Sequence, residues 1–305
     1  MSVERALPRP GAAVRESIVS VPRILPDGLY EELVTDELAR AIAALEPGRS
    51  TRIDAVDAAE LDGVLSRHLA REIARTIAAV PAVKRTDAAR ELVKALLGQL
   101  AALAQHTGLD ADALSAQEVA APTRRLMSVH RGTAPDRPAT PLSTSTLLTR
   151  APSEPAIGHE LLRELASADR LDVIVAFVTV GGIRRLWDRL EDFSRRHLHT
   201  GDGERLRLLT TTFTGTTERE ALDKLATLPG VSVKVSYDVR RTRLHAKAWL
   251  FHRESGLSTA YVGSANLTAT ALGEGHEWMV KICADDMPHV LEKVQRDLRD
   301  PVGRP

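Results

Sequence analysis

Four polar residues in the last third of the chain, His245, Lys247, Ser264 and Asn266, have spacings that allow them to act together. The chain around His245 and Lys247 alternates in the period of a strand, so these two side chains are expected on one face. Ser264 and Asn266 share a face of the next strand in the same way. A hairpin centred near residues 255–256 places Lys247 about opposite Ser264 and His245 about opposite Asn266. We therefore expect four polar groups to converge.

These residue types suit the cleavage of a phosphodiester. The imidazole of His245 can attack phosphorus and form a covalent phosphohistidine, which divides one difficult displacement into two easier ones. Lys247, Ser264 and Asn266 can donate hydrogen bonds to the non-bridging oxygens of the phosphate. Glu277 follows Asn266 by eleven positions (277 minus 266) and can accept from one imidazole nitrogen, which makes the other nucleophilic. Nothing here resembles a carboxylate cage for a metal, so we expect neither a metal nor another cofactor.

A simpler interpretation exists for each part of this pattern. His245 and Lys247 alone would indicate an exposed polar face of a strand. Ser264 and Asn266 alone could be ordinary turn residues. The complete set, with Glu277 at its spacing, favours catalysis.

A basic stretch surrounds the histidine. Residues 234–253 hold six basic residues and one acidic residue, a balance of plus five (six minus one). Such a stretch can attract a phosphate backbone. Three arginines directly before the motif are candidates for substrate binding, with simple solvation as the alternative: Arg240, Arg241 and Arg243.

Composition sets the class of protein. Hydrophobic residues make up 43% of the 305 residues and charged residues 27%, as is typical of a globular chain, and the 41 basic residues balance 41 acidic ones. No apolar run approaches the ~20 residues that span a bilayer, and the first residues lack the apolar core of a secretory signal. Cys283, the single cysteine, excludes an internal disulfide and is expected to be a buried strand thiol. We therefore expect a cytoplasmic protein without a membrane partner.

The elements that position these residues belong to the second half of the chain. Proline-rich residues 1–25 are expected to be a mobile tail, and residues 26–130 an all-helical region that begins with Thr35 as an N-cap. Residues 131–146 are rich in Gly, Pro, Ser and Thr, which predicts a linker. In residues 147–305, buried strands alternate with helices, which predicts an α/β domain with a mixed sheet flanked by helices.

The motif also resembles that of the phospholipase D superfamily. His245 and Lys247, then Gly-Ser-x-Asn ending at Asn266, then Glu277, match its pattern of His-x-Lys, Gly-Ser-x-Asn and a later acidic residue, and the resemblance covers residues 147–288. It implies a phospholipase-D-like fold and a pocket in which two half-sites meet, one histidine attacking and the other protonating the leaving group. Because this chain has one copy of the motif, the resemblance implies a homodimer or pairing with another protein. One departure is His252, at a position where the family often has a structural aspartate.

A narrower resemblance involves three segments, residues 27–35, 141–149 and 164–169. They are similar to the amino-terminal region of large bacterial DEAD/DEAH-type helicases, in which a phospholipase-D-like nuclease domain precedes the motor. The chain contains no Gly-x-x-x-x-Gly-Lys-Ser/Thr loop, so we expect a free-standing relative or a fragment. The resemblance implies a role linked to a helicase in bacterial restriction or anti-phage defence.

Three functions follow as hypotheses. The first is a metal-independent nuclease acting as a dimer on DNA, with RNA as the alternative substrate. The second is a lipid phosphodiesterase of the phospholipase D type, for which the chain offers few aromatic residues and no amphipathic aromatic and basic helix. The third is a catalytically silent DNA-binding module.

Overall fold

The computed structural model describes residues 23–107, 110–196, 203–237 and 244–299. The chain divides into two compact units between Leu126 and Met127. Most of the expected amino-terminal tail, residues 1–22, lies outside the described residues.

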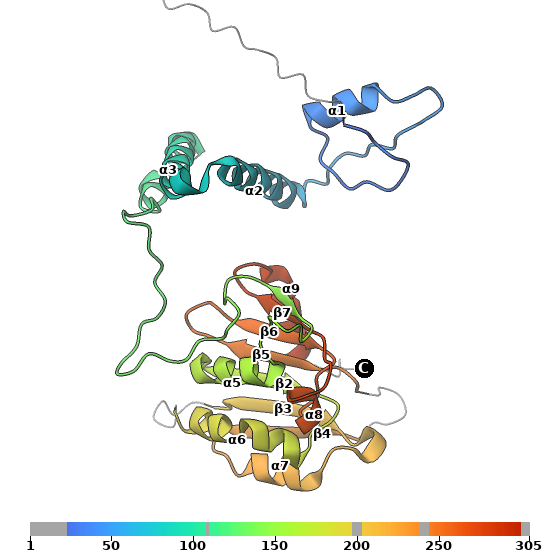
Figure 1. Ribbon diagram of the computed structural model, residues 1–305, viewed down its shortest axis with the longest axis vertical. Coiled ribbons are helices and arrows are strands. Elements are labelled where there is room, and N and C mark those ends of the chain that lie inside the picture. The colour runs from blue at the N-terminus through green and yellow to red at the C-terminus, as the bar shows by residue number, and fades with distance from the viewer. Residues whose placement is uncertain (1–22, 108–109, 197–202, 238–243, 300–305) are drawn as a thin grey trace, which may run out of the picture. The chain divides into compact units, whose positions relative to one another are not determined.

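The first unit is helical, as predicted (Figure 1). Thr35 is the N-cap of its first helix and its side chain accepts a hydrogen bond from the backbone N–H of Leu38, at 3.3 Å. Leu25, Leu38 and Ala41 form a small buried cluster around this helix. Four helices are described in this unit, and the last of them was not predicted: α1 (Asp36–Ala43), α2 (Leu61–Ala79), α3 (Ala82–Thr107) and α4 (Ala111–Ser115).

The second unit contains a mixed seven-stranded sheet, which confirms the predicted fold class. Its strands lie in the order β1-β7-β6-β5-β2-β3-β4; β2, β3 and β4 run parallel, and every other neighbouring pair is antiparallel. The strands are β1 (Thr146–Leu148), β2 (Arg170–Ile174), β3 (Leu206–Thr211), β4 (Val231–Ser236), β5 (Ala248–His252), β6 (Thr259–Gly263) and β7 (Met279–Cys283). Both the short edge strand β1 and its pairing with β7 were missing from the sequence prediction.

Helices cover both faces of this sheet (Figure 1). The larger core packs one face against four helices: α5 (Ile157–Ser167), α6 (Val180–Arg195), α7 (Arg219–Ala226) and α8 (Ala269–Leu272). A smaller core around Leu250, Ala260 and Ile282 packs the other face against α9 (Pro288–Arg299). Buried aromatic side chains such as Trp249 and Tyr261 belong to the larger core, which fixes the face toward which the odd-numbered residues of β5 and β6 point.

A buried network of charges ties the edge of the sheet to α5. The carboxylate of Glu164 is fully buried and accepts from Arg253 at 2.5 Å and from the hydroxyl of Tyr261 at 2.7 Å. The ammonium of Lys281, also fully buried, lies 3.1 Å from Glu164 and 3.7 Å from Glu160. Two anions and two cations therefore neutralise one another inside the unit.

The segment expected as a linker, residues 131–146, falls within the second unit, and its end makes polar contacts with α5 and β7. The backbone N–H groups of Ala139 and Thr140 donate to the Glu160 carboxylate at 2.8 and 2.9 Å. The Ser145 hydroxyl accepts from the backbone N–H of Cys283 at 3.0 Å. These contacts position the start of β1 beside β7.

Candidate active site

His245 and Lys247 lie directly before β5, at the end of the sheet where β6 finishes. Their side chains meet, because the ammonium of Lys247 lies 3.0 Å from both ring nitrogens and donates to the carbonyl oxygen of His245 at 2.7 Å. An imidazole nitrogen that accepts from an ammonium must carry its lone pair. His245 is exposed, whereas only 7% of Lys247 is accessible to solvent. The imidazole of His245, the candidate nucleophile, is thus accessible to a substrate and contacts a buried cation, the ammonium of Lys247.

The environment of Lys247 changes its acidity. Burial lowers the pKa of its ammonium, and the carboxylate of Glu277 opposes that shift in part. The charge of Glu277 therefore acts at the lysine.

Ser264 and Glu277 form a second pair at the same end of the sheet. The Ser264 hydroxyl donates to the Glu277 carboxylate and accepts from the backbone N–H of Trp278 at 3.0 Å. Within the described residues, Glu277 makes no hydrogen bond to the His245 imidazole, contrary to the geometry expected from sequence. In this state Glu277 orients the Ser264 hydroxyl, and its negative charge raises the pKa of Lys247.

Asn266 connects the site to the end of β2. Its side-chain oxygen accepts from the backbone N–H of Phe177 at 3.1 Å, and no hydrogen bond of its NH₂ group is seen among the described residues, so that group can donate to a substrate. The Phe177 ring meets the His245 ring edge to face, with centroids 6.4 Å apart. Sequence reasoning missed Phe177 as a site residue. The only signal in the sequence was the position of Phe177 near the end of a largely apolar run, residues 171–178.

The register of the hairpin corrects one expectation. Ala248 pairs with Val262, and the backbone N–H of Gly263 donates to the carbonyl of Lys247 at 3.2 Å. Gly263, rather than Ser264, therefore lies opposite Lys247, because the hairpin is centred on residue 255 and not between residues 255 and 256, which shifts the pairing by one residue. A Cβ atom on Gly263 would lie 2.0 Å from the carbonyl oxygen of Trp278, so close packing of β6 on β7 requires glycine here.

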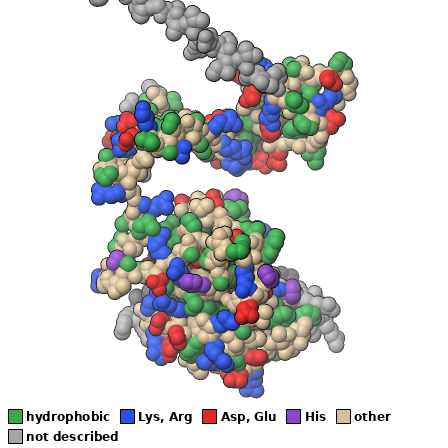
Figure 2. Space-filling model, in the orientation of Figure 1, with side chains coloured by type: hydrophobic (Ala, Val, Ile, Leu, Met, Phe, Trp, Pro, Cys, Tyr) green, Lys and Arg blue, Asp and Glu red, His purple; other side chains and the backbone are tan. Residues whose placement is uncertain are grey.

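All three arginines predicted to bind substrate lie outside the described residues: Arg240, Arg241 and Arg243. In the part of the chain that is described, no group of three or more His, Cys, Asp or Glu side chains is arranged to hold a metal ion. Among the described helices, none is both long enough and apolar enough to cross a bilayer. Acidic and basic side chains are interspersed on the face of the second unit seen in Figure 2.

Comparison with known families agrees with this geometry. Residues 159–299 match the model of a family described as "Cardiolipin synthase, PLD-like domain", where PLD stands for phospholipase D. The second unit is therefore similar to this family, and we refer to it as the PLD-like domain. The matched residues include all five members of the candidate site: His245, Lys247, Ser264, Asn266 and Glu277.

Solved structures similar to the PLD-like domain include two bacterial proteins of comparable extent. NucT from Helicobacter pylori is 12% identical, with a TM-score of 0.38, and the match covers 51% of this chain and 93% of NucT. The phospholipase D family member Nuc from Salmonella typhimurium is 16% identical, with a TM-score of 0.36 and coverage of 52% and 93%. Polyphosphate kinase from Porphyromonas gingivalis is 14% identical, with a TM-score of 0.39 and coverage of 64% and 30%. No curated protein matches the chain. At these identities and scores, the likenesses carry no information about activity.

The PLD-like domain holds His252 in a polar cluster at the opposite end of β5. Its Nε2 atom lies 2.8 Å from the carboxylate of Asp172, which also accepts two hydrogen bonds from Arg207, at 2.6 and 2.7 Å. Burial opposes ionisation of Asp172, but hydrogen bonds from His252 and Arg207 and the charge of Arg170 outweigh it, so the pKa of Asp172 lies well below its usual value. Asp172 thus provides a carboxylate on the neighbouring strand, where it supports β2, β3 and β5 together.

Proposed function

We propose that the PLD-like domain is a metal-independent phosphodiesterase that cleaves nucleic acid, DNA in the first place, through a phosphohistidine on His245. The observation that supports this most directly is the meeting of an exposed imidazole with a buried lysine. Ser264, Asn266 and Glu277 complete the group of donors and charges at the same end of the sheet.

In the proposed first step, an imidazole nitrogen of His245 attacks phosphorus. An N–P bond forms as the P–O bond to the leaving group breaks, and negative charge on the non-bridging oxygens is stabilised by Lys247 and the Asn266 amide. Lys247 already donates to the ring, so it moves from the imidazole to a phosphate oxygen when substrate binds. The leaving oxygen takes a proton from a second imidazole, and a homodimer supplies that group from the second copy. In the next step, the second imidazole, now neutral, takes a proton from a water molecule that attacks phosphorus; a P–O bond forms, and the N–P bond breaks with its electron pair returning to His245.

Nucleic acid is the preferred substrate because of local charge. Residues 234–253 surround the motif; Arg253 is buried and paired with Glu164, which leaves five basic residues and one acidic residue, a balance of plus four (five minus one). A polyanion would be attracted to this stretch, and binding would weaken as salt is raised. The similarity of the amino-terminal segments to helicase-associated nucleases supports a role with a helicase in restriction or defence.

A lipid substrate is the second candidate. The matching family carries the name of a cardiolipin synthase. Three apolar side chains on β1 and beside or on β7 are exposed: Leu147 (42%), Trp278 (62%) and Val280 (43%). Release of a headgroup from phospholipid vesicles, without cleavage of DNA, would favour this function.

Purified protein incubated with plasmid and single-stranded DNA in EDTA tests the proposal. We expect cleavage by the wild type and its loss, by at least about a thousandfold, in His245→Ala. His276→Ala is the matched control, because His276 is exposed in the same region and should be dispensable. Cleavage that EDTA abolishes would contradict the metal-independent mechanism. DNA binding unchanged by His245→Ala, with no cleavage by any variant, would indicate a silent binding module.

A further inference from the structure

Arg150 occupies an unusual backbone conformation in the turn between β1 and α5. Its φ of 66° lies in the left-handed region, which non-glycine residues adopt at a cost of about 1 kcal/mol or more. The carboxylate of Glu154 holds the turn by accepting from the backbone N–H groups of Thr149 at 2.7 Å and Ala151 at 3.1 Å. The surrounding turn therefore imposes this conformation on an arginine.

The guanidinium of Arg150 has no carboxylate partner among the described residues. It is half-buried and donates from Nη1 to the carbonyl oxygen of Gly275 at 3.2 Å, two positions before Glu277. The buried cations Arg253 and Lys281, in contrast, are each paired with a glutamate. Arg150 thus keeps donors and a positive charge available beside the loop that carries Glu277.

Strand register places Arg150 in line with the catalytic histidine. Leu148 pairs with Met279, and continuing that pairing by two residues puts Arg150 across from Glu277. Backbone hydrogen bonds extend two neighbouring registers past the ends of the strands, from the N–H of Gly263 to the carbonyl of Lys247 and from the N–H of Ser264 to the carbonyl of Trp278. Continued by one or two residues, these registers give a row that runs from the edge inward through Arg150, Glu277, Ala265 and His245.

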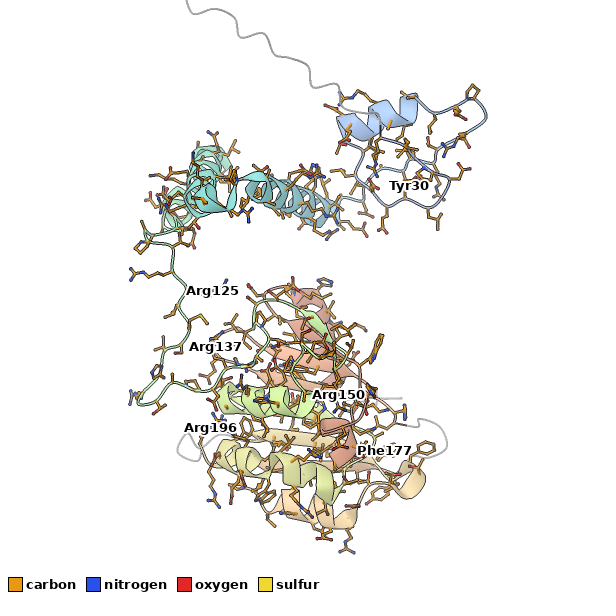
Figure 3. The ribbon with its side chains drawn as sticks, viewed as in Figure 1. Tyr30, Arg125, Arg137, Arg150, Phe177 and Arg196 are labelled. Carbon is orange, nitrogen blue, oxygen red and sulfur yellow. The ribbon has the colours of Figure 1, made fainter. Side chains whose placement is uncertain are left out.

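This row runs along the face that His245 presents. With strands about 4.8 Å apart, three spacings put the Cα atoms of Arg150 and His245 about 14 Å from each other. Arg150 and Phe177 are labelled on the same side of the second unit in Figure 3.

We propose that Arg150 is a substrate-binding residue that contacts a backbone phosphate next to the one attacked by His245, on the Glu277 side of the site. This inference rests on the proposed function. A planar guanidinium matches two phosphate oxygens and keeps its charge at every relevant pH. Arg150 precedes the residues that match the family model, so the motif does not assign it this role.

Arg150→Gly is an informative variant, because glycine adopts a positive φ without strain. It removes the guanidinium and should leave the melting temperature unchanged or slightly raised. Arg150→Lys keeps the charge but loses the planar donor pair. Arg296→Ala, which removes an exposed arginine from α9, is the control for net charge.

Binding of a labelled single-stranded oligonucleotide is measured at several salt concentrations, in a His245→Ala background that prevents turnover. We expect Arg150→Gly to raise Kd about tenfold and to reduce the slope of log K against log salt by about 0.7, the value for one phosphate contact on a single strand. Arg150→Lys should recover most of the slope and only part of the affinity. The control should leave Kd and slope unchanged.

Two results would overturn the inference while leaving the proposed function intact. One is an unchanged Kd and slope in Arg150→Gly when the parent binds and the wild type cleaves. The other is a fall in kcat alone, which would make Arg150 a positioning residue for the loop of Glu277. If the parent does not bind DNA and the wild type does not cleave it, the proposed function fails together with this inference.

Discussion

Replacing Glu164 by glutamine should destabilise the second unit severely without touching the candidate site. The Glu164 carboxylate accepts four contacts: Arg253 at 2.5 Å, Tyr261 at 2.7 Å, Thr259 at 3.0 Å and Lys281 at 3.1 Å. A neutral amide keeps one acceptor oxygen and turns an NH₂ donor toward groups that are themselves donors.

The magnitude follows from the burial of this network. Glu164→Gln leaves two buried cations, Arg253 and Lys281, with Glu160 as the remaining buried anion. Removing one partner of a buried ion pair costs about 3–5 kcal/mol. Total stability of a domain is about 5–15 kcal/mol, so the loss is a large fraction of it. For a unit of this size, the expected fall in Tm is about 6–20 °C.

Tryptophan fluorescence during urea unfolding measures this loss in the whole chain. All three tryptophans, Trp187, Trp249 and Trp278, lie in the second unit, so the signal reports that unit alone. Glu254→Gln is the matched control on the exposed turn of the same hairpin and should change the free energy of unfolding by less than about 0.5 kcal/mol. A loss of 1 kcal/mol or less in Glu164→Gln would refute the reasoning that the buried charges depend on one another.

Three further predictions concern the site and its support. Lys247→Met should lower the rate of cleavage about 10²–10³-fold. Because burial lowers the pKa of Lys247, activity in a pH–rate profile should be lost below about pH 10.4 on the alkaline side. Lys247→Arg should move that loss of activity to higher pH. Gly263→Ala should cost about 1–3 kcal/mol in urea unfolding and reduce cleavage, because its new methyl group overlaps the carbonyl of Trp278; a fully active, stable variant would contradict the close packing. The folded-state pKa of Asp172 is depressed, so the ionised carboxylate stabilises the fold above about pH 3.9, and this contribution declines as the pH falls below that value. The difference in the free energy of unfolding between wild type and Asp172→Asn should therefore shrink from pH 6 to pH 3. A constant difference would refute this.

Local patterns were enough to predict the mixed sheet, the core strands and the helices that follow them. Apart from Asp172, the strand around Val173 is apolar from Leu171 onward because both of its faces are covered. Thr35 could be identified as an N-cap from its own type and the acidic residues after it. Helix α9 was missed although its apolar residues Leu291, Val294 and Leu298 recur at helical spacing.

Other features depend on contacts between distant segments. Strand β1 has three residues within a Ser- and Thr-rich run, and only its pairing with β7 makes it a strand. The pairing of β5 with β6 differs by one residue from the predicted pairing, because the sequence of the turn did not determine the centre of the hairpin. The partner of Glu277 is Ser264 because β6 and β7 are adjacent, which spacing along the chain does not reveal. The conformation of Arg150 likewise depends on Glu154 and the turn around it.

The covalent intermediate tests the central claim most directly. Wild-type protein is mixed with end-labelled DNA in EDTA, quenched in alkali within the first turnovers, digested and examined by mass spectrometry. We expect a nucleotide adduct on the imidazole of His245, and neither adduct nor cleavage in His245→Ala. Cleavage that proceeds without an adduct on His245, or that persists in His245→Ala, would contradict the proposal that this histidine is the nucleophile.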